Sequence, residues 1–241
     1  MGRQHLMLTK RAIPNGIKYA IDKTGAPVST AELFRSAVET GSLPPITITP
    51  LFNRKHHMTR HIEEISDVET VQDLLHPVQA FLTFRSMSGP DALVKKQGWI
   101  AVPDQAGLTD DEQQGFYEAL RTQGESSFLA LPLEPALSAY RVPATLNAIA
   151  DCERTCCLFN YAFVNSTYSW CILLTTDNYK IVVGEEPFVR QVLGNTVEQT
   201  FADFLTYAQQ PFWGEFTRAL TYIHDWLLVY NHALPGETVI F

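Results

Sequence analysis

The sequence predicts an α+β fold in which a three-stranded antiparallel meander, at about residues 157–184, is packed by helices on either side of it in the chain. Three observations support this prediction. Aromatic and β-branched runs follow one another across turns of three residues, and connections this short join only antiparallel neighbours. Before and after these runs, apolar residues recur at helical spacing. The first part of the chain instead contains many prolines and glycines and little periodicity.

A basic N-terminal arm is expected over residues 1–55, and its composition indicates a mostly extended chain with one short helix. The helix is predicted from Ser29 to Gly41, because Ser29 and Glu32 form a capping box and Gly41 follows the last apolar residue of the stripe. The rest of the chain, residues 56–241, is long enough for one acidic α+β domain.

Helices and strands alternate in the first half of that domain. Capping boxes at Ser66–Glu69 and Thr109–Glu112 each indicate the start of a helix. The predicted elements are a helix from residue 66 interrupted at Pro77, a stretch at 78–84 that continues as helix or becomes strand, a strand at 98–103, a helix over 109–124, an extended segment at 128–133, and a helix over 143–152 with Pro143 in its first turn.

The predicted meander consists of three runs, 157–164, 168–175 and 179–184. In the first run the alternation places Cys157, Phe159, Tyr161 and Phe163 on one face, and in the second it places Tyr168, Trp170, Ile172 and Leu174 together.

The remainder of the chain is predicted to be helical, with helices over 187–194 and from Thr196, and a long last helix opened by Pro211. The chain then ends on Val239, Ile240 and Phe241. We expect this apolar tail to return as an edge strand on the chain's own sheet, and the alternative is that it adds to the sheet edge of a partner.

Charge is divided very unevenly between the two parts of the chain. Residues 1–60 carry nine Lys/Arg and three Asp/Glu, whereas residues 61–241 carry nine Lys/Arg and 23 Asp/Glu, so their net charges are +6 and −14. A basic arm on an acidic domain suggests contacts with oppositely charged surfaces. No apolar run is long enough to span a membrane and no secretory signal is recognisable, so a soluble cytoplasmic protein is expected.

One candidate metal site lies where the arm meets the domain. His57 and His61 are four residues apart, and Glu64 lies one turn further on, so a helix would bring the three side chains to one side. The alternative is a solvated junction in which the histidines are exposed or pair with Glu63 and Glu64. His61-Ile62-Glu63 also matches half of a zinc deaminase signature, but the cysteine half has the wrong spacing.

The four cysteines lie within twenty residues of one another, at Cys152, Cys156, Cys157 and Cys171. They are predicted to be reduced and mostly buried as small apolar side chains. A thiolate metal site or a redox pair is the alternative, although the CxxxC spacing differs from that of zinc knuckles and thioredoxin-like motifs.

These observations favour a non-catalytic interaction protein, that is, an inhibitor, a regulator or an assembly subunit. No dinucleotide, P-loop, nucleophile-elbow or EF-hand motif is present, so no cofactor is expected. The expected partner is a protein, possible partners being a basic protein and a second copy of the chain in a homo-oligomer. Two alternatives stay open: a small metal-dependent enzyme using His57, His61 and Glu64, and non-specific nucleic-acid contact through the arm.

Overall fold

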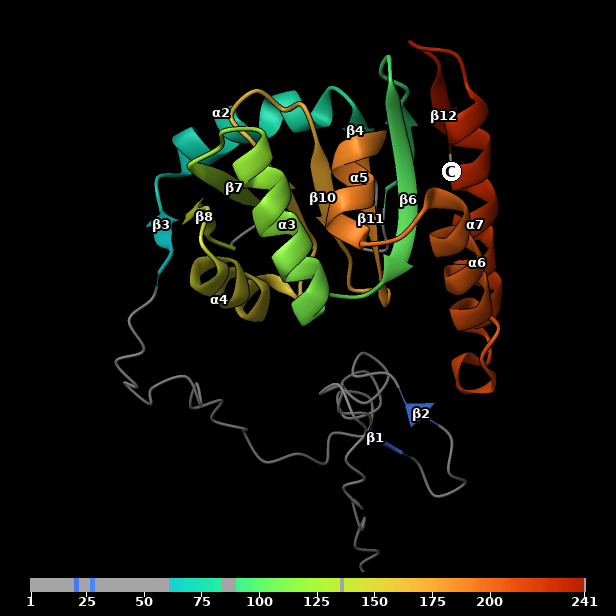
Figure 1. Ribbon diagram of the computed structural model, residues 1–241. Helices are drawn as coiled ribbons and strands as arrows, with labels where there is room; N and C mark the ends of the chain where they lie inside the picture. The colour runs from blue at the N-terminus through green and yellow to red at the C-terminus, as the bar shows by residue number, and fades with distance from the viewer. Residues whose placement is uncertain (1–19, 22–26, 29–60, 84–89, 135–136, 241) are drawn as a thin grey trace, which may run out of the picture. The chain divides into compact units, whose positions relative to one another are not determined.

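A computed structural model of the chain describes residues 20–21, 27–28, 61–83, 90–134 and 137–240 (Figure 1). The chain divides into two compact units, Met1–His56 and His57–Phe241. In the first unit, β1 (Ala20–Ile21) and β2 (Pro27–Val28) form an antiparallel pair. The helix predicted from Ser29 lies outside the described residues.

The second unit is built on a seven-stranded sheet with the strand order β3-β8-β7-β9-β10-β11-β6 (Figure 1). The α+β class is therefore confirmed, but the prediction of a three-stranded sheet is wrong. The meander exists as β9, β10 and β11, and four further strands extend it because they pair with segments distant in sequence. All neighbours are antiparallel, and the strands are β3 (Glu63–Ile65), β6 (Trp99–Gln105), β7 (Ser127–Pro132), β8 (Ala139–Pro143), β9 (Tyr161–Val164), β10 (Cys171–Leu174) and β11 (Tyr179–Glu185).

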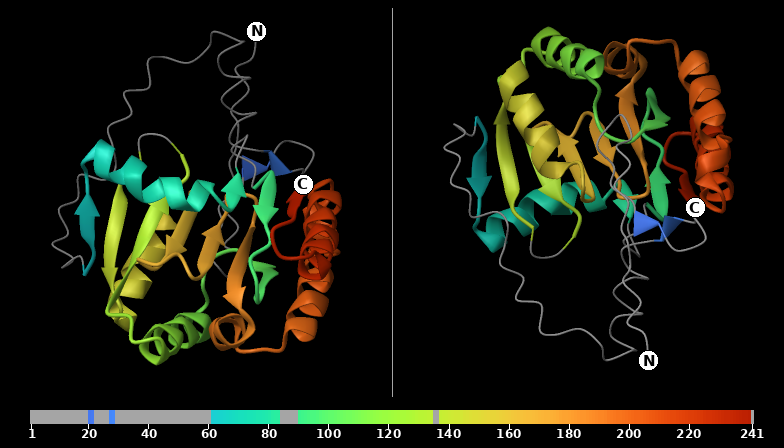
Figure 2. Two further views of the ribbon diagram at one scale, coloured as in Figure 1. Left: turned by 90° about the horizontal axis from the view of Figure 1, so that it is seen from above. Right: turned by 90° about the horizontal axis from the view of Figure 1, so that it is seen from below.

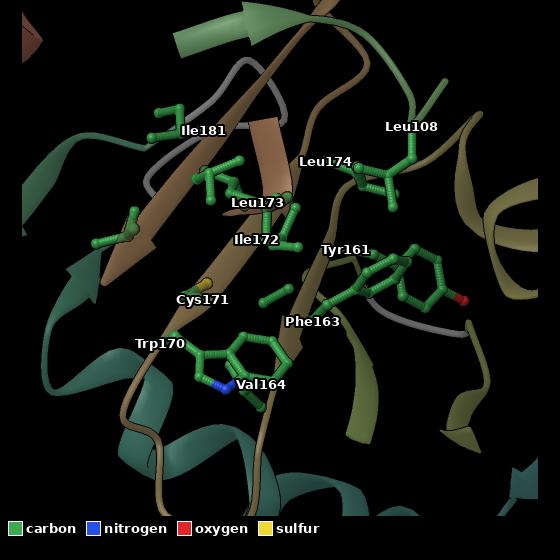
Figure 3. Packing of buried hydrophobic residues seen from close by; sticks show 14 of the residues in the cluster. Leu108, Tyr161, Phe163, Val164, Trp170, Cys171, Ile172, Leu173, Leu174 and Ile181 are labelled. Atoms are coloured by element: carbon green, nitrogen blue, oxygen red, sulfur yellow. The ribbon is translucent and has the colours of Figure 1, made fainter. Parts of the chain in front are cut away.

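Both faces of the meander are buried. Ile172 and Leu174 of β10 share a face with their β9 partners, Phe163 and Tyr161, whereas Leu173 points to the opposite face (Figure 3). The predicted first strand begins later than expected. Cys157 is the C-cap of the preceding helix, so it does not share the strand face with Tyr161 and Phe163.

Three helices cover one face of the sheet: α3 (Asp110–Thr122), α4 (Leu146–Cys156) and α5 (Glu186–Leu193) (Figure 2). The capping box of Thr109 and Glu112 at the start of α3 is confirmed. The helix predicted from Pro143 starts later, because Pro143 ends β8 and the Thr145 side chain caps α4. The stacked rings of Trp170 and Phe188, 4.9 Å between centroids, pack α5 onto the sheet.

Helix α2 (Val68–Gln79) lies on the opposite side of the sheet from these three helices (Figure 2). Asp67, and not Ser66, is its N-cap, since the Asp67 side chain accepts a hydrogen bond from the Thr70 backbone N–H. The helix continues through Pro77 to Gln79, so Pro77 does not interrupt it. The stretch at 78–84, predicted as either helix or strand, ends the helix and then forms a short strand as far as Thr83.

That strand belongs to a second, three-stranded antiparallel sheet with the order β12-β5-β4. Its strands are β4 (Leu82–Thr83), β5 (Ala92–Val94) and β12 (Thr238–Ile240). The prediction that the C-terminal tail returns to a sheet of its own chain is confirmed, although the sheet is not the meander. Val239 is half-buried opposite Leu93, while Ile240 remains exposed.

Helices α6 (Val197–Ala208) and α7 (Phe216–His232) form an antiparallel pair beside β6, the last strand of the large sheet (Figure 1). Asn231 of α7 accepts a hydrogen bond from Ala101 N (2.8 Å) and donates one to Ala101 O (3.0 Å). The amide side chain thus replaces a neighbouring strand at this position of the sheet edge. Pro211 opens a short 3-10 turn, Pro211–Trp213, and not the long helix predicted there.

Candidate functional site

A groove with a volume of about 630 Å³ opens between α2 and two described segments at the end of β7 and before β8, residues 132–134 and 137–138. Helix α2 contributes a stripe of one helical face, and the facing wall comes from Leu133, Glu134, Leu137 and Ser138. Val68 is 72% exposed at one end of the stripe. The stripe consists of Val68, Val71, Gln72, Leu75, Val78 and Gln79.

Glu134 is the carboxylate in the wall of this groove, and a buried amide holds it in place. Asn160, which is 1% exposed, donates hydrogen bonds to Glu134 Oε1 from its backbone N (3.1 Å) and from its side-chain Nδ2 (2.8 Å). Asn160 is fixed in turn, because its Oδ1 accepts a hydrogen bond from the Thr176 backbone N–H (3.0 Å). The carboxylate is therefore positioned before any ligand binds.

A second carboxylate meets the same wall. The Ser138 hydroxyl donates a hydrogen bond to Oε1 of Glu64, a residue of the edge strand β3. Residues 61–83, which include β3 and α2, contain five Asp/Glu and no Lys or Arg. The groove itself is lined by apolar side chains, several polar ones and the carboxylate of Glu134, a combination that favours a ligand with both a cationic and an apolar part.

Two lysines further along the chain, Lys95 and Lys96, direct their ammonium groups inward, whereas Arg85, the first base after residue 83, lies outside the described residues. Lys95 Nζ lies 4.8 Å from the centre of the Tyr230 ring and donates a hydrogen bond to Trp99 O. Lys96 Nζ lies 4.1 Å from the Trp99 ring and donates to Tyr168 O (3.2 Å). Burial lowers the pKa of both lysines.

Most arginines of the domain are also occupied by their own neighbours. Four of them lie within 4.0 Å of a carboxylate: Arg121 with Glu118, Arg141 with Glu63, Arg154 with Asp151, and Arg190 with Glu186. The residues that the structure describes in this domain include eight Lys/Arg and 23 Asp/Glu. The surface available to a partner is consequently acidic.

The most buried ion cluster of the described residues lies on the helix-covered face. Lys180 Nζ is 2.9 Å from Asp104 Oδ2 and 2.8 Å from Glu112 Oε1, and it donates a hydrogen bond to Gln105 O (2.8 Å). These contacts use the three donors of the ammonium group, and Lys180 is 1% exposed. The cluster therefore has no donor left for a substrate, and we assign it a structural role.

The two carboxylates of this cluster are shifted in opposite directions. Burial raises the pKa of Glu112, and the neighbouring Asp104 adds to that shift. Burial also acts to raise the pKa of Asp104, but Lys180 together with hydrogen bonds from Glu112, Lys180 and Gln105 outweighs it and holds that pKa below its usual value.

The four cysteines are free, three of them are buried, and Cys157 is half-buried, in agreement with the prediction. The Sγ atoms of Cys152 and Cys156 are 3.9 Å apart on α4. Burial raises the pKa of Cys152 well above its usual value, that of Cys157 to about 11 and that of Cys171 to about 12. Protonated, buried thiols are poor nucleophiles and poor metal ligands, which favours the interpretation that they fill space.

The predicted histidine site is only partly within view, because His57 lies outside the described residues. His61 and Glu64 make separate contacts: the His61 backbone N–H lies 3.3 Å from Asp151 Oδ2, and Glu64 accepts from Ser138. Glu63–Ile65 is a strand, so the helical spacing behind the prediction does not apply at Glu64. Within the described ranges no three His, Cys, Asp or Glu side chains are grouped as metal ligands, and the metal site stays a prediction.

Sequence reasoning missed Glu134 and Asn160. A signal was available in the segment Leu131-Pro132-Leu133-Glu134-Pro135, where a lone charge stands among apolar residues and prolines at the end of a strand. No protein-family model, curated protein or solved structure matches the chain. None of the described helices has the length and apolar character needed to cross a membrane.

Proposed function

We propose that this chain is a non-catalytic interaction protein whose acidic domain binds a basic protein partner. One observation carries the proposal: among the residues that the structure describes in this domain, 23 Asp/Glu stand against eight Lys/Arg, and most of the acids are exposed. Two of the bases, Lys95 and Lys180, are buried, and four exposed arginines pair with carboxylates of the same domain, so the bases offset little of the negative surface charge. An uncompensated acidic surface accelerates and orients association with a basic one.

The nature of the buried polar groups agrees with this function. A catalytic centre needs a titratable group that can reach a substrate. Lys180 and its two carboxylates contact one another, and Cys152 and Cys171 are buried, which raises the pKa of both thiols. The accessible feature is instead a groove with apolar and polar lining residues and the carboxylate of Glu134.

The experiment measures binding of the full chain to fluorescent peptides of about 12 residues that share their apolar residues and differ only in charge. We expect the basic peptide to bind at least about tenfold more tightly than the neutral one, and its affinity to fall about tenfold between about 50 and 500 mM salt, because the salt screens the attraction. An acidic peptide should not bind. Equal affinity for all three peptides, or no binding at all, would overturn the proposal.

A further inference from the structure

We propose that the α2 groove is the binding site itself, and that Glu134 binds a Lys or Arg side chain of the partner while adjacent apolar side chains of the same segment enter the groove. This inference rests on the proposed function and adds a location, an anchor residue and a ligand chemistry. The ligand is a short amphipathic peptide segment in which a base neighbours an apolar cluster.

The groove is a concavity of the protein surface with a volume of about 630 Å³. The groove lies within the size range of binding sites for ligands and for clusters of side chains. Val71, Leu75 and Val78 form its floor and are themselves buried, so the floor is rigid.

Three apolar residues of the α2 stripe, Val71, Leu75 and Val78, belong to the domain's own core, and a fourth, Val68, lies outside it. The stripe recurs every three or four residues along the helix, and its first member, Val68, is largely in water. A helix of 12 residues is about 18 Å long, which is enough for a ligand segment of several residues. Covering this stripe would remove exposed apolar surface from water, which stabilises a complex.

Glu134 supplies the charge selection. Both hydrogen bonds from Asn160 go to Oε1, so the carboxylate is oriented by a group that is neutral and leaves its negative charge intact. Glu64, held by Ser138, adds a second negative charge to the same wall. A cationic side chain that enters the groove would bind a carboxylate that is already oriented. Glu134 would therefore need little reorganisation on binding.

A basic segment is a better occupant than a second copy of this domain. The groove and its rim carry acids, and no Lys or Arg occurs among residues 61–83. Two acidic domains brought together at this surface would place like charges opposite one another. Charge complementarity therefore selects a basic partner for this groove.

The test uses the full chain and a peptide of about 12 residues with leucines at helical spacing and lysines beside them. Glu134→Gln keeps the shape and the bond from Asn160 but removes the charge, and we expect it to weaken binding about tenfold. The matched control is Glu198→Gln, an exposed acid of α6, which should leave the affinity within about twofold. Circular dichroism confirms that each variant is folded.

A second pair of variants tests the apolar half. Val68→Ser should weaken binding about threefold to fivefold because it removes part of the groove stripe, while Val229→Ser, at a comparably exposed valine of α7, should not. A charge swap gives a gain of function. The peptide for this test has glutamates in place of its lysines. Glu134→Lys should bind this acidic peptide more tightly than the parent chain binds it.

The outcomes separate this inference from the proposed function. If the basic peptide binds with strong salt dependence but Glu134→Gln and Val68→Ser bind as the parent does, the groove is not the site, although the acidic domain still binds basic partners. If the basic peptide does not bind the parent chain, both proposals fail. If the groove variants change the chain's own mass in analytical ultracentrifugation and not its peptide affinity, a second copy is the occupant, and the inference is wrong.

Discussion

On the face of the large sheet covered by α3, α4 and α5, the cation Lys180 is enclosed by the carboxylates of Asp104 and Glu112. On the side of α2, the carboxylate of Glu134 accepts hydrogen bonds from the backbone and side-chain amides of Asn160, pairs with no Lys or Arg among the described residues, and lies in the wall of a groove. The first arrangement satisfies its own charges and the second leaves a negative charge to be met from outside. Closed ion clusters stabilise a fold or make it specific, whereas a positioned and unneutralised charge in a groove recognises a ligand.

The two faces of the large sheet also differ in how completely other elements cover them. Three helices seal the first face, with aromatic contacts among Phe116, Trp170 and Phe188 at 4.9–6.4 Å between ring centroids. One helix and a sheet of very short strands cover the second. A closely packed face serves stability, and an incompletely covered face is where a partner finds apolar surface.

The largest expected effect is on the closed face. Lys180→Met removes the cation and leaves Asp104 and Glu112 buried against one another, so the free energy of unfolding should fall by about 3–5 kcal/mol. Urea denaturation followed by tryptophan fluorescence measures it. The control is Arg190→Ala, which breaks an exposed pair with Glu186 and should cost less than about 0.5 kcal/mol. Equal losses in the two variants would contradict the distinction drawn between closed and exposed charges.

A smaller effect is expected for the amide that holds the groove carboxylate. Asn160→Ala removes the side-chain hydrogen bond to Glu134, keeps the one from the backbone N–H, and removes the Oδ1 that accepts from the Thr176 N–H, so we expect a loss of about 1–3 kcal/mol in unfolding free energy. The variant should also weaken peptide binding, because Glu134 loses one of its two orienting hydrogen bonds. Asn195→Ala, at an exposed position, is the control and should change neither quantity. An Asn160→Ala chain with unchanged affinity would show that this side-chain hydrogen bond to Glu134 is irrelevant to binding.

The pH dependence of stability should also separate the two carboxylates of the closed cluster. Glu112 has a raised pKa, so its contribution to stability is present below its usual value of 4.5 and is lost as the pH rises through the raised value. Asp104 has a lowered pKa, so its contribution is present above its usual value of 3.8 and is lost as the pH falls through the lowered value.

Two variants and urea denaturation over a range of pH test these opposite signs. The stability difference between the parent chain and Glu112→Gln should shrink from about pH 4 to about pH 7. The difference between the parent chain and Asp104→Asn should instead shrink as the pH falls below about 3.8. The same sign of pH dependence in both variants would mean that the cluster is solvated and not closed.

Local patterns in the sequence predicted the elements that depend on neighbouring residues. The capping box of Thr109 and Glu112, the helix end at Gly194 and the meander from β9 to β11 were all predictable, because each is set by residues a few positions apart. The extent of the sheet was not. Strand β6 pairs with β11 and β7 pairs with β9 across long stretches of chain, and β8 is a short strand whose alternation is weak.

The candidate site was less predictable than the fold for the same reason. Glu134 and Asn160 are 26 residues apart, and only the pairing of β7 with β9 brings them together. Lys180 meets Asp104 because β11 and β6 are neighbours, a contact over 76 residues. Conversely, the histidine spacing was legible in the sequence but assumed a helix, whereas Glu63–Ile65 pairs as a strand with β8.

The last and smallest expected effect is a difference in thiol labelling rate, which reports how readily the covering of each face of the large sheet opens. Cys152 and Cys156 lie on α4, beneath the closed face, and Cys171 points from β10 toward the side of α2 and the small sheet, where it lines a narrow void with Phe81 and Leu93. Burial raises the pKa of Cys152 and of Cys171, so each reacts with a thiol reagent only after its covering opens. Strands of two or three residues separate at a lower free energy than a packed set of helices.

Half-buried Cys157 should therefore label first and Cys171 second. Cys152 and Cys156 should label at least about tenfold more slowly than Cys171, which corresponds to a difference of about 1.4 kcal/mol in opening free energy. Mass spectrometry of proteolytic peptides gives the order, and Cys157→Ser, which removes the half-buried thiol, should leave the order of the others unchanged. Labelling of Cys152 and Cys156 before Cys171 would contradict the inference that the face covered by α3, α4 and α5 opens less readily than the face covered by α2 and the small sheet.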